Sequence, residues 1–174
     1  MEDVKWFVAC VHTNTEQQTA KHLDAMGIEN YVPAQTVLRV RRSGRKVKSL
    51  RNVIPGMVFV RCSDEMRRTR VVSLSTVLRF LSDRTKGKSH VAEIPDSEIE
   101  LLRFMVGQSE IPVSFERESF AKGMKVRVIR GPLQGLAGEV VETNHDNSEI
   151  TVRLENLGCA RLSISTADLI TATD

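Results

Sequence analysis

Apolar and polar residues follow two different periods in the first hundred positions. Lys5 to Val11 is a short apolar run rich in β-forming side chains, which predicts a strand buried on both faces. After it, Thr13-Asn14-Thr15 offers an N-cap, and apolar residues recur at near-helical spacing until Gly27. This pattern predicts a helix over residues 16–26.

Extended segments dominate the next part of the chain. Residues 30–40 and 47–54 read as two strands joined through a Ser43-Gly44 turn, which predicts an arginine-rich β-hairpin. Pro55-Gly56 then breaks the chain, and Met57 to Cys62 is a further apolar strand.

Two more helices are expected before residue 107. Ser63-Asp64-Glu65 caps the first of them, whose basic face would hold Arg67, Arg68 and Arg70. A further strand follows, and Pro95-Asp96-Ser97 opens a helix with one apolar side. The order β-α-β-β-α-β with a terminal helix is typical of an α+β, ferredoxin-like sandwich, in which helices cover one side of an antiparallel sheet.

The pattern changes after Gly107. Residues 108–121 contain Pro112 and mixed charge without a sustained period, which predicts a linker. Beyond it, short alternating strands are separated by Gly, Pro and Asn turn signals. We expect a small SH3-like β-barrel over 122–174, because an open sheet of such short strands would leave its edges exposed. The predicted first domain is 1–107.

Positive charge is concentrated in the first half of the chain. The 174 residues include 25 Lys plus Arg and 22 Asp plus Glu, so the formal net charge is only +3. The stretch 35–61 holds eight basic residues and no acidic one, whereas 91–121 holds seven acidic residues against two basic. Such segregation favours a polyanionic partner, although a charge run is most often a solvated surface.

The composition argues against several functional classes. No apolar run approaches the ~20 residues that span a bilayer, and the first residues lack the features of a signal peptide. The three cysteines, Cys10, Cys62 and Cys159, lie far apart, as expected of reduced thiols in a cytosol. The histidines have no metal-ligand spacing, and no phosphate-binding loop follows a strand. We therefore expect a cytoplasmic protein that is not an enzyme and needs no cofactor.

Two stretches contain specific sequence motifs in addition to a hydrophobic period. The first is Lys5-Trp6-Phe7-Val8 together with Ile54-Pro55-Gly56-Met57-Val58-Phe59-Val60, and the second runs from Gly123 to Val140 through Gly131-Pro132-Leu133-Gln134-Gly135. In this order and spacing they resemble the NusG family of transcription elongation factors. Its amino-terminal (NGN) domain bears W-[YF]-V and P-G-Y-V-x-V strands, and its KOW domain carries the second pattern. The resemblance covers nearly the whole chain.

The resemblance implies a contact with RNA polymerase. In the family, an apolar depression of the NGN domain holds the clamp helices of the β′ subunit. The residues that match its lining are Trp6, Cys10, Met57 and Phe59. Met57 and Phe59 alternate with Val58 and Val60, so they point to the sheet face that the predicted helices leave uncovered. Ordinary core packing is the alternative for each residue, and above all for Trp6.

The resemblance also implies a second polymerase contact, to the β gate loop, and a contact with non-template DNA. The gate-loop segment corresponds to Arg68, Thr69 and Arg70. The positions that read DNA in specialised family members correspond to His12, Asn14, Gln18, Lys21, His22, Ser75 and Thr76. Phosphate contacts from the hairpin would come from Arg41, Arg42, Arg45 and Lys46, and their affinity would fall with salt. A solvated surface is the alternative for all of these groups.

The glycines of the second motif are expected to shape the barrel. Gly131, Gly135 and Gly138 stand where the chain must turn tightly, and Pro132 fixes φ at one turn. In the family this domain binds a ribosomal protein or the termination factor Rho, which the resemblance implies as partners here. The sequence leaves open an autoinhibited form in which this segment is helical, but the alternating strands favour the barrel.

Together these features predict a monomeric factor that binds the β′ and β subunits of RNA polymerase. By binding the closed clamp it would suppress pausing or termination. Leu133-Gln134, where phenylalanine is common in the family, points to an operon-specific paralogue similar to the UpxY-type antiterminators of capsular polysaccharide loci in Bacteroides-type bacteria. The alternative is a ribosome- or RNA-binding KOW protein whose first domain is a scaffold.

Overall fold

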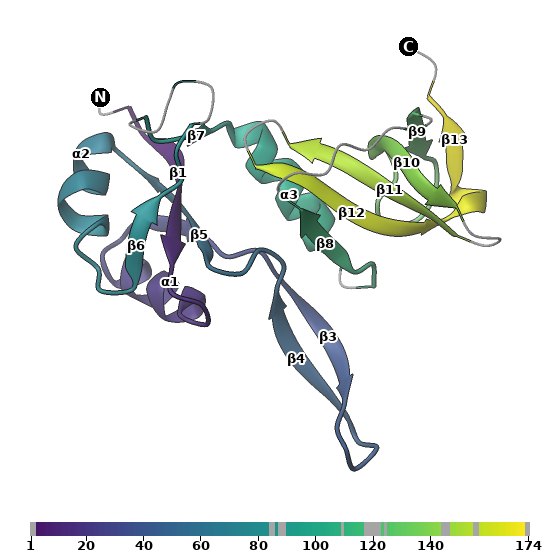
Figure 1. The fold of residues 1–174 in the computed structure, drawn as a ribbon, viewed down its shortest axis with the longest axis horizontal. Helices are drawn as coiled ribbons and strands as arrows, with labels where there is room; N and C mark the ends of the chain where they lie inside the picture. The colour runs from purple at the N-terminus through teal and green to yellow at the C-terminus, as the bar shows by residue number, and fades with distance from the viewer. Residues whose placement is uncertain are drawn as a thin grey trace. The chain divides into compact units, whose positions relative to one another are not determined.

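The structure, a computed structural model, describes residues 3–83, 86, 90–108, 110–116, 123, 125–143, 147–154 and 157–172. The chain divides into two units, Met1–Pro33 with Ile54–Glu100 and Ala34–Val53 with Leu101–Asp174. Helices and antiparallel sheets both occur, which confirms the predicted α+β class (Figure 1).

An antiparallel sheet forms the centre of the first unit. Its strand order is β2-β5-β1-β6, and the short β7 also pairs with β1. The central position of β1 and β5 agrees with their continuous apolar runs, because a strand covered on both faces is apolar on both. The strands are β1 (Lys5–Val11), β2 (Glu29–Tyr31), β5 (Met57–Cys62), β6 (Val77–Phe80) and β7 (Glu93–Ile94).

Helices cover one face of this sheet. They are α1 (Glu16–Ala25) and α2 (Asp64–Met66), which continues directly into the π-helical turn η1 (Arg67–Val71). The core on this side combines alternate residues of β1 and β5 with Leu23 of α1 and Val71 of η1. Val58 and Val60 belong to it, as the sequence predicted. A third helix, α3 (Asp96–Val106), begins after Pro95.

The predicted helix-end signals are followed at Gly27 and Ser63 but not at the start of α1. The Ser63 hydroxyl accepts a hydrogen bond from the Met66 N–H at 3.3 Å, and Gly27 ends α1 with φ of +70°. Thr15 occupies the N-cap position of α1, but its hydroxyl donates back to the His12 carbonyl at 2.7 Å. The predicted side-chain cap of α1 is therefore wrong.

The second unit contains a long hairpin of β3 (Ala34–Val40) and β4 (Lys46–Asn52), paired along their whole length. The sequence predicted one strand over 30–40, whereas the structure has β2 and β3 separated at Val32-Pro33. Proline lacks an N–H and cannot continue the ladder, so the chain leaves the first sheet there.

Gln35 and Arg51 hold the base of this hairpin. The Gln35 amide donates to the carbonyls of Gln108 (3.1 Å) and Ile111 (2.9 Å) and accepts from the Val113 N–H (2.9 Å). The Arg51 guanidinium donates to the Val113 carbonyl at 2.7 Å. These bonds join the hairpin to the segment that leads into β8 (Val113–Glu116).

A six-stranded antiparallel sheet completes the second unit, in the order β13-β9-β10-β11-β12-β8. Its strands agree with the predicted barrel and not with the helical alternative. They are β8, β9 (Lys125–Val128), β10 (Ala137–Thr143), β11 (Asn147–Leu154), β12 (Gly158–Ser165) and β13 (Leu169–Thr171), with the 3-10 turn η2 (Thr166–Asp168) before β13.

Strand β8 corrects the predicted linker. Residues 108–121 were expected to lack a strand, but β8 lies within them and pairs with β12. Its alternation of buried and exposed residues covers only a short stretch, in which Val113 is buried and Ser114 is exposed. A four-residue alternation directly after Pro112 is too brief to stand out in the sequence.

Candidate functional site

The four residues predicted to contact the clamp helices share one sheet face. Cys10 of β1 is the ladder partner of Met57 of β5, and Val8 is the partner of Phe59. Trp6 lies two residues before Val8 and therefore points the same way. We call these five residues the Trp6 face; it is opposite the core that the helices cover.

The Trp6 face is buried. Trp6 is 3%, Cys10 8%, Met57 4% and Phe59 0% exposed. The sequence predicted that this face would be left open, and that expectation is wrong for the structure. Alternation along a strand fixes the face to which a side chain points, but it carries no information about what lies over that face.

Aromatic and charged groups border the Trp6 face on one side. The Tyr31 ring of β2 lies beside Phe59, with ring centroids 6.0 Å apart. The Trp6 indole N–H donates to the Asp96 carboxylate at 2.9 Å. Arg61, the ladder partner of Trp6, forms an ion pair with Glu29 at 3.2 Å. The Asp96 carboxylate thus supplies the hydrogen-bond acceptor that the indole N–H of a buried tryptophan requires.

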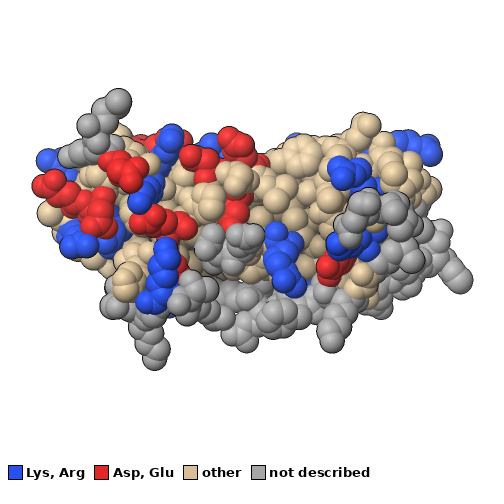
Figure 2. All heavy atoms as spheres, turned by 90° about the horizontal axis from the view of Figure 1, so that it is seen from above, with Lys and Arg blue, Asp and Glu red and all other residues tan. Residues whose placement is uncertain are grey.

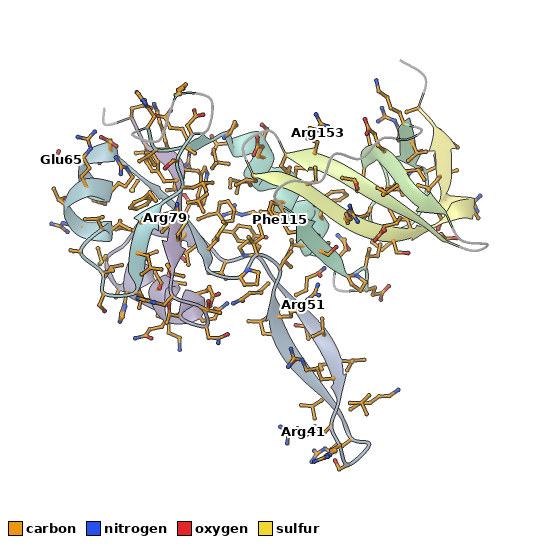
Figure 3. All side chains as sticks on the ribbon, viewed as in Figure 1. Arg41, Arg51, Glu65, Arg79, Phe115 and Arg153 are labelled. Atoms are coloured by element: carbon orange, nitrogen blue, oxygen red, sulfur yellow. The ribbon has the colours of Figure 1, made fainter. Side chains whose placement is uncertain are left out.

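An exposed cation borders the opposite edge of the Trp6 face. Arg79 of β6, labelled in Figure 3, is the ladder partner of Cys10. Its side chain is exposed. Sequence reasoning missed this residue, because its place depends on the β1–β6 register. The run Val77 to Phe80 predicts a strand but not its partner.

Arg68, Thr69 and Arg70, the predicted gate-loop residues, are all exposed on η1. Arg68 forms an ion pair with Asp64 at 2.7 Å, and the Thr69 hydroxyl donates to the Glu65 carbonyl at 2.9 Å. The segment therefore presents two cations on a helical turn that protein bonds already order.

Arg67 does not belong to this basic surface, contrary to the sequence prediction. It is buried, and its guanidinium lies 5.2 Å from the ring centroids of both Phe7 and Phe80. It also forms an ion pair with Asp64. Hydrogen bonding to Arg67 is the main reason that the pKa of Asp64 lies below its ordinary value of 3.8. Arg67 is therefore a structural residue that fixes α2–η1 on the sheet.

The structure brings the start of α1 next to the turn before β6. The His12 N–H donates to the Thr76 carbonyl at 3.1 Å, and the Thr19 and Thr76 hydroxyls are 2.8 Å apart. Because Thr76 is only 6% exposed and bonded to Thr19, its predicted contact with nucleic acid does not fit this structure. The other predicted DNA-reading residues are exposed, and they are His12, Asn14, Gln18, Lys21, His22 and Ser75.

The hairpin carries its predicted cations at and near its tip. Arg41 lies at the tip and Arg51 at the base (Figure 3). Arg41, Arg42, Arg45 and Lys46 are all exposed. The sequence did not single out the apolar side chains on one hairpin face, which are also exposed: Leu38 (65%), Val40 (66%) and Leu50 (57%). A mixed basic and apolar surface of this kind suits nucleic acid, whose phosphates and bases need both.

Comparison with known proteins decides the family. Residues 4–103 match the family described as NusG, transcription termination factor nusG. The chain belongs to the NusG family. A solved structure of Thermotoga maritima NusG, 20% identical, covers 98% of both chains with a TM-score of 0.57, so the two share a fold.

Two curated NusG proteins show how much sequence identity this chain shares with its relatives. The transcription termination/antitermination protein NusG of Synechocystis is 25% identical over 135 residues, which is 73% of this chain and 64% of that protein. The match thus spans slightly less than two thirds of the Synechocystis protein. The Thermus thermophilus protein of the same name is 24% identical over 174 residues, 89% of this chain and 91% of that protein.

Gly131 and Gly135 of the KOW-type turn have the expected geometry, whereas Gly138, also expected at a tight turn, lies within strand β10. Gly131 and Gly135 adopt φ of +84° and +92°, and the Gly135 N–H donates to the Val128 carbonyl at 2.8 Å. Pro132 lies between them in the turn, and Gly138 follows in β10, where an added Cβ would lie 2.8 Å from the Thr151 carbonyl oxygen. Leu133, which replaces the family's common phenylalanine, is fully buried. These residues shape the sheet.

The matched family and the Synechocystis relative are described as transcription termination or antitermination factors. Cys10, Cys62 and Cys159 are buried and form no disulfide, and burial raises the pKa of Cys62 to about 11, so this thiol stays protonated. Among the residues that the structure describes, no group of His, Cys, Asp or Glu is arranged to hold a metal. In the same residues, no helix has the length and apolar character needed to cross a membrane.

On the face shown in Figure 2, the described basic residues do not gather into a single patch. Figure 2 shows acidic and basic side chains intermixed on the face that it presents. Ion pairs such as Lys5–Glu93 (2.9 Å) and Arg61–Glu29 (3.2 Å) bring opposite charges together. The basic residues that lie close together in the sequence therefore form local basic surfaces, on the hairpin and on η1.

Proposed function

We propose that this NusG-family protein is a transcription elongation or antitermination factor that binds RNA polymerase. The relatives carry the name transcription termination/antitermination protein. The observation that supports polymerase binding most is the gathering of Trp6, Cys10, Met57 and Phe59 on one sheet face. These are the residues that the family resemblance assigns to the β′ clamp helices.

The proposed clamp contact requires the Trp6 face to become accessible. Its side chains are at most 8% exposed, so a helix cannot lie directly on them in the present conformation. Arg79, already exposed at the edge of the face, offers a first contact for an acidic or polar group of the partner. Apolar contact would follow once the face opens.

A second contact would act on the other side of the polymerase cleft. Arg68, Thr69 and Arg70 are exposed and belong to an ordered helical turn, which suits a contact with the β gate loop. A ligand that binds both sides of the cleft favours the closed clamp and so makes paused or terminating states rarer. No covalent chemistry is needed.

Contact with the non-template strand would make the factor selective. The polar side chains of α1 are exposed beside Ser75, and the hairpin adds cations for phosphates. Hydrogen bonds to unstacked bases can distinguish sequences, whereas phosphate contacts only add affinity. We therefore propose action at particular operons, as in UpxY-type antiterminators, with polymerase contacts from residues 1–107 and a ribosomal protein or Rho as partner of residues 122–174.

Burial of the Trp6 face also favours a second candidate function. A ribosome- or RNA-binding KOW protein with a scaffold amino-terminal domain needs no accessible apolar face, and Phe59 is 0% exposed. In that case the second unit alone would carry the binding activity.

Co-sedimentation separates the two candidates. Full-length protein is mixed with purified bacterial transcription elongation complexes or with purified ribosomes at equal concentration. Retention by elongation complexes in the absence of ribosomes supports the polymerase-binding factor. Retention by ribosomes alone would contradict it and support the scaffold reading.

A further inference from the structure

The start of α1 is held from two sides by hydrogen bonds to distant segments of the first unit. On one side, the Gly56 N–H donates to the Glu16 carboxylate at 2.6 Å, and the Val11 N–H donates to the Gly56 carbonyl at 2.9 Å. On the other side, the His12 N–H donates to the Thr76 carbonyl at 3.1 Å. The chain between β1 and α1 is therefore attached both to the residue before β5 and to the residue before β6.

A bond between two buried hydroxyls adds to this attachment. Thr19 is 0% and Thr76 6% exposed, and their hydroxyl oxygens lie 2.8 Å apart. The Thr19 hydroxyl also lies 2.9 Å from the Thr15 carbonyl, which can only accept. Because a hydroxyl has one proton, both bonds form together when Thr19 donates to Thr15 and accepts from Thr76. The Thr76 hydroxyl thus uses its only donor inside the protein.

The same segments carry exposed polar side chains. Gln18 of α1, His12 and Asn14 before this helix, and Ser75 beside Thr76 are all exposed. They belong to the surface proposed above to contact non-template DNA. Asn14 adopts a φ of +66°, which asparagine tolerates better than most residues. The buried bonds therefore fix the backbone from which the exposed groups project.

Reading of a DNA sequence places stricter demands on geometry than binding of phosphates. A hydrogen bond to a base edge distinguishes sequences only when the protein group keeps its position, which requires support by further hydrogen bonds. Thr76 supports both parts of the exposed surface, because its carbonyl holds His12 and its hydroxyl holds α1 through Thr19. The hairpin cations do not take part in these bonds, so their contacts with phosphates do not depend on them.

We propose that Thr19 and Thr76 are positioning residues for sequence reading, which act through their mutual hydrogen bond and do not touch DNA themselves. This proposal rests on the proposed contact between the surface at α1 and non-template DNA. The family resemblance implies a DNA contact for Thr76, and the structure favours a positioning role instead. Thr19, which the resemblance does not include, acquires the same role.

Fluorescence anisotropy with the full-length protein tests this role. The probe is a single-stranded DNA oligonucleotide that the wild type selects from a random library, and its shuffled sequence is the reference. The ratio of the two affinities measures the sequence preference. We expect Thr19→Val and Thr76→Val each to reduce this preference by about tenfold, with the affinity for the shuffled sequence unchanged. The double variant is expected to lose no more than either single variant, since both remove the same bond.

Two control variants separate the hydroxyl bond from other effects. Thr76→Ser keeps the hydroxyl and is expected to keep the preference. Ser73→Ala removes an exposed hydroxyl that donates to the Arg70 carbonyl, outside the Thr19–Thr76 bond, and is also expected to keep it. Affinities are measured below the melting transition of every variant, so that unfolding does not contribute.

Each other outcome contradicts the proposal in a recognisable way. If the wild type selects no sequence, the proposed DNA contact is contradicted, and the positioning role is overturned with it. If the wild type has a preference and only Thr76→Val reduces it, Thr76 touches DNA directly and the positioning role is overturned alone. Unchanged preference in both variants, additive losses in the double variant, or an equal loss of affinity for the shuffled sequence would likewise overturn it.

Discussion

At the residue scale, Arg67 shows that a basic residue in a charged segment can belong to the core. Its guanidinium lies 5.2 Å from the ring centroids of both Phe7 and Phe80, which contact each other edge to face, and bonds to Asp64. We predict that Arg67→Met lowers the free energy of unfolding by about 1–3 kcal/mol, because cation–π contacts and a charge-assisted hydrogen bond are lost.

Chemical denaturation measures this loss, with Arg68→Met as the matched control. Arg68 also pairs with Asp64, but its side chain is 69% exposed. An exposed pair contributes little, so the control is expected to change the unfolding free energy by less than about 0.5 kcal/mol. Equal effects of the two variants would show that Arg67 does not act through burial against the two rings.

Asp64 makes part of the stability depend on pH. Hydrogen bonding to Arg67 lowers the pKa of this carboxyl below 3.8 in the folded protein. A group whose pKa is depressed by folding stabilises the protein above its unfolded pKa, and this contribution is lost as the pH falls through the folded value. We therefore expect the wild type to exceed Asp64→Asn in unfolding free energy at pH 7, and the difference to shrink at pH below 4. Denaturation curves at several pH values measure it, and a difference that stays constant with pH would contradict this origin.

At the element scale, the β3–β4 hairpin is the clearest candidate for an electrostatic contact. Its cations near the tip are exposed, and Gln35 and Arg51 hold its base. Binding of single-stranded DNA weakens as salt rises, so log affinity falls with log salt. Replacing Arg41, Arg42, Arg45 and Lys46 by glutamine is expected to make this slope less steep by up to about 3, at about 0.7 per lost phosphate contact.

Fluorescence anisotropy over a salt series measures this slope. The matched control replaces three exposed cations elsewhere, Lys86, Arg103 and Arg130, by glutamine. An unchanged slope in the hairpin variant, or an equal loss in the control, would show that the hairpin is not the contact.

Elements were predictable from the sequence where their signal was long or chemically specific. The apolar runs of β1 and β5 and the Ser63 cap gave correct strands and a correct helix start. The four-residue β8 was hidden because its alternation is brief. The π-helical turn η1 was not predictable, since burial of Arg67 against the Phe7 and Phe80 rings depends on tertiary contacts.

At the scale of the whole molecule, the sequence predicted which residues share the Trp6 face but not that the face is buried. Side-chain alternation is a local property, whereas covering depends on segments distant in the sequence. For the same reason the bond between Thr19 and Thr76, which removes Thr76 from the candidate DNA surface, was not predictable. Arg79 was missed because only the β1–β6 register places it beside Cys10.

Truncation of the Trp6 face is a poor test of the polymerase contact. Phe59 is fully buried, and replacing a buried phenylalanine by alanine costs about 3–5 kcal/mol. Lost binding would then report unfolding. A photoreactive side chain of nearly the same size avoids this problem, because volume-conserving changes in a core are tolerated best.

The most direct test is photo-crosslinking within a purified elongation complex. A diazirine analogue of methionine is placed at position 57, on the Trp6 face, and a diazirine analogue of leucine at position 58, in the core under the helices. We predict that the label at 57 crosslinks to the β′ clamp helices and that the label at 58 does not. If both proteins bind the complex and the label at 57 gives no β′ crosslink, the clamp contact through the Trp6 face is contradicted.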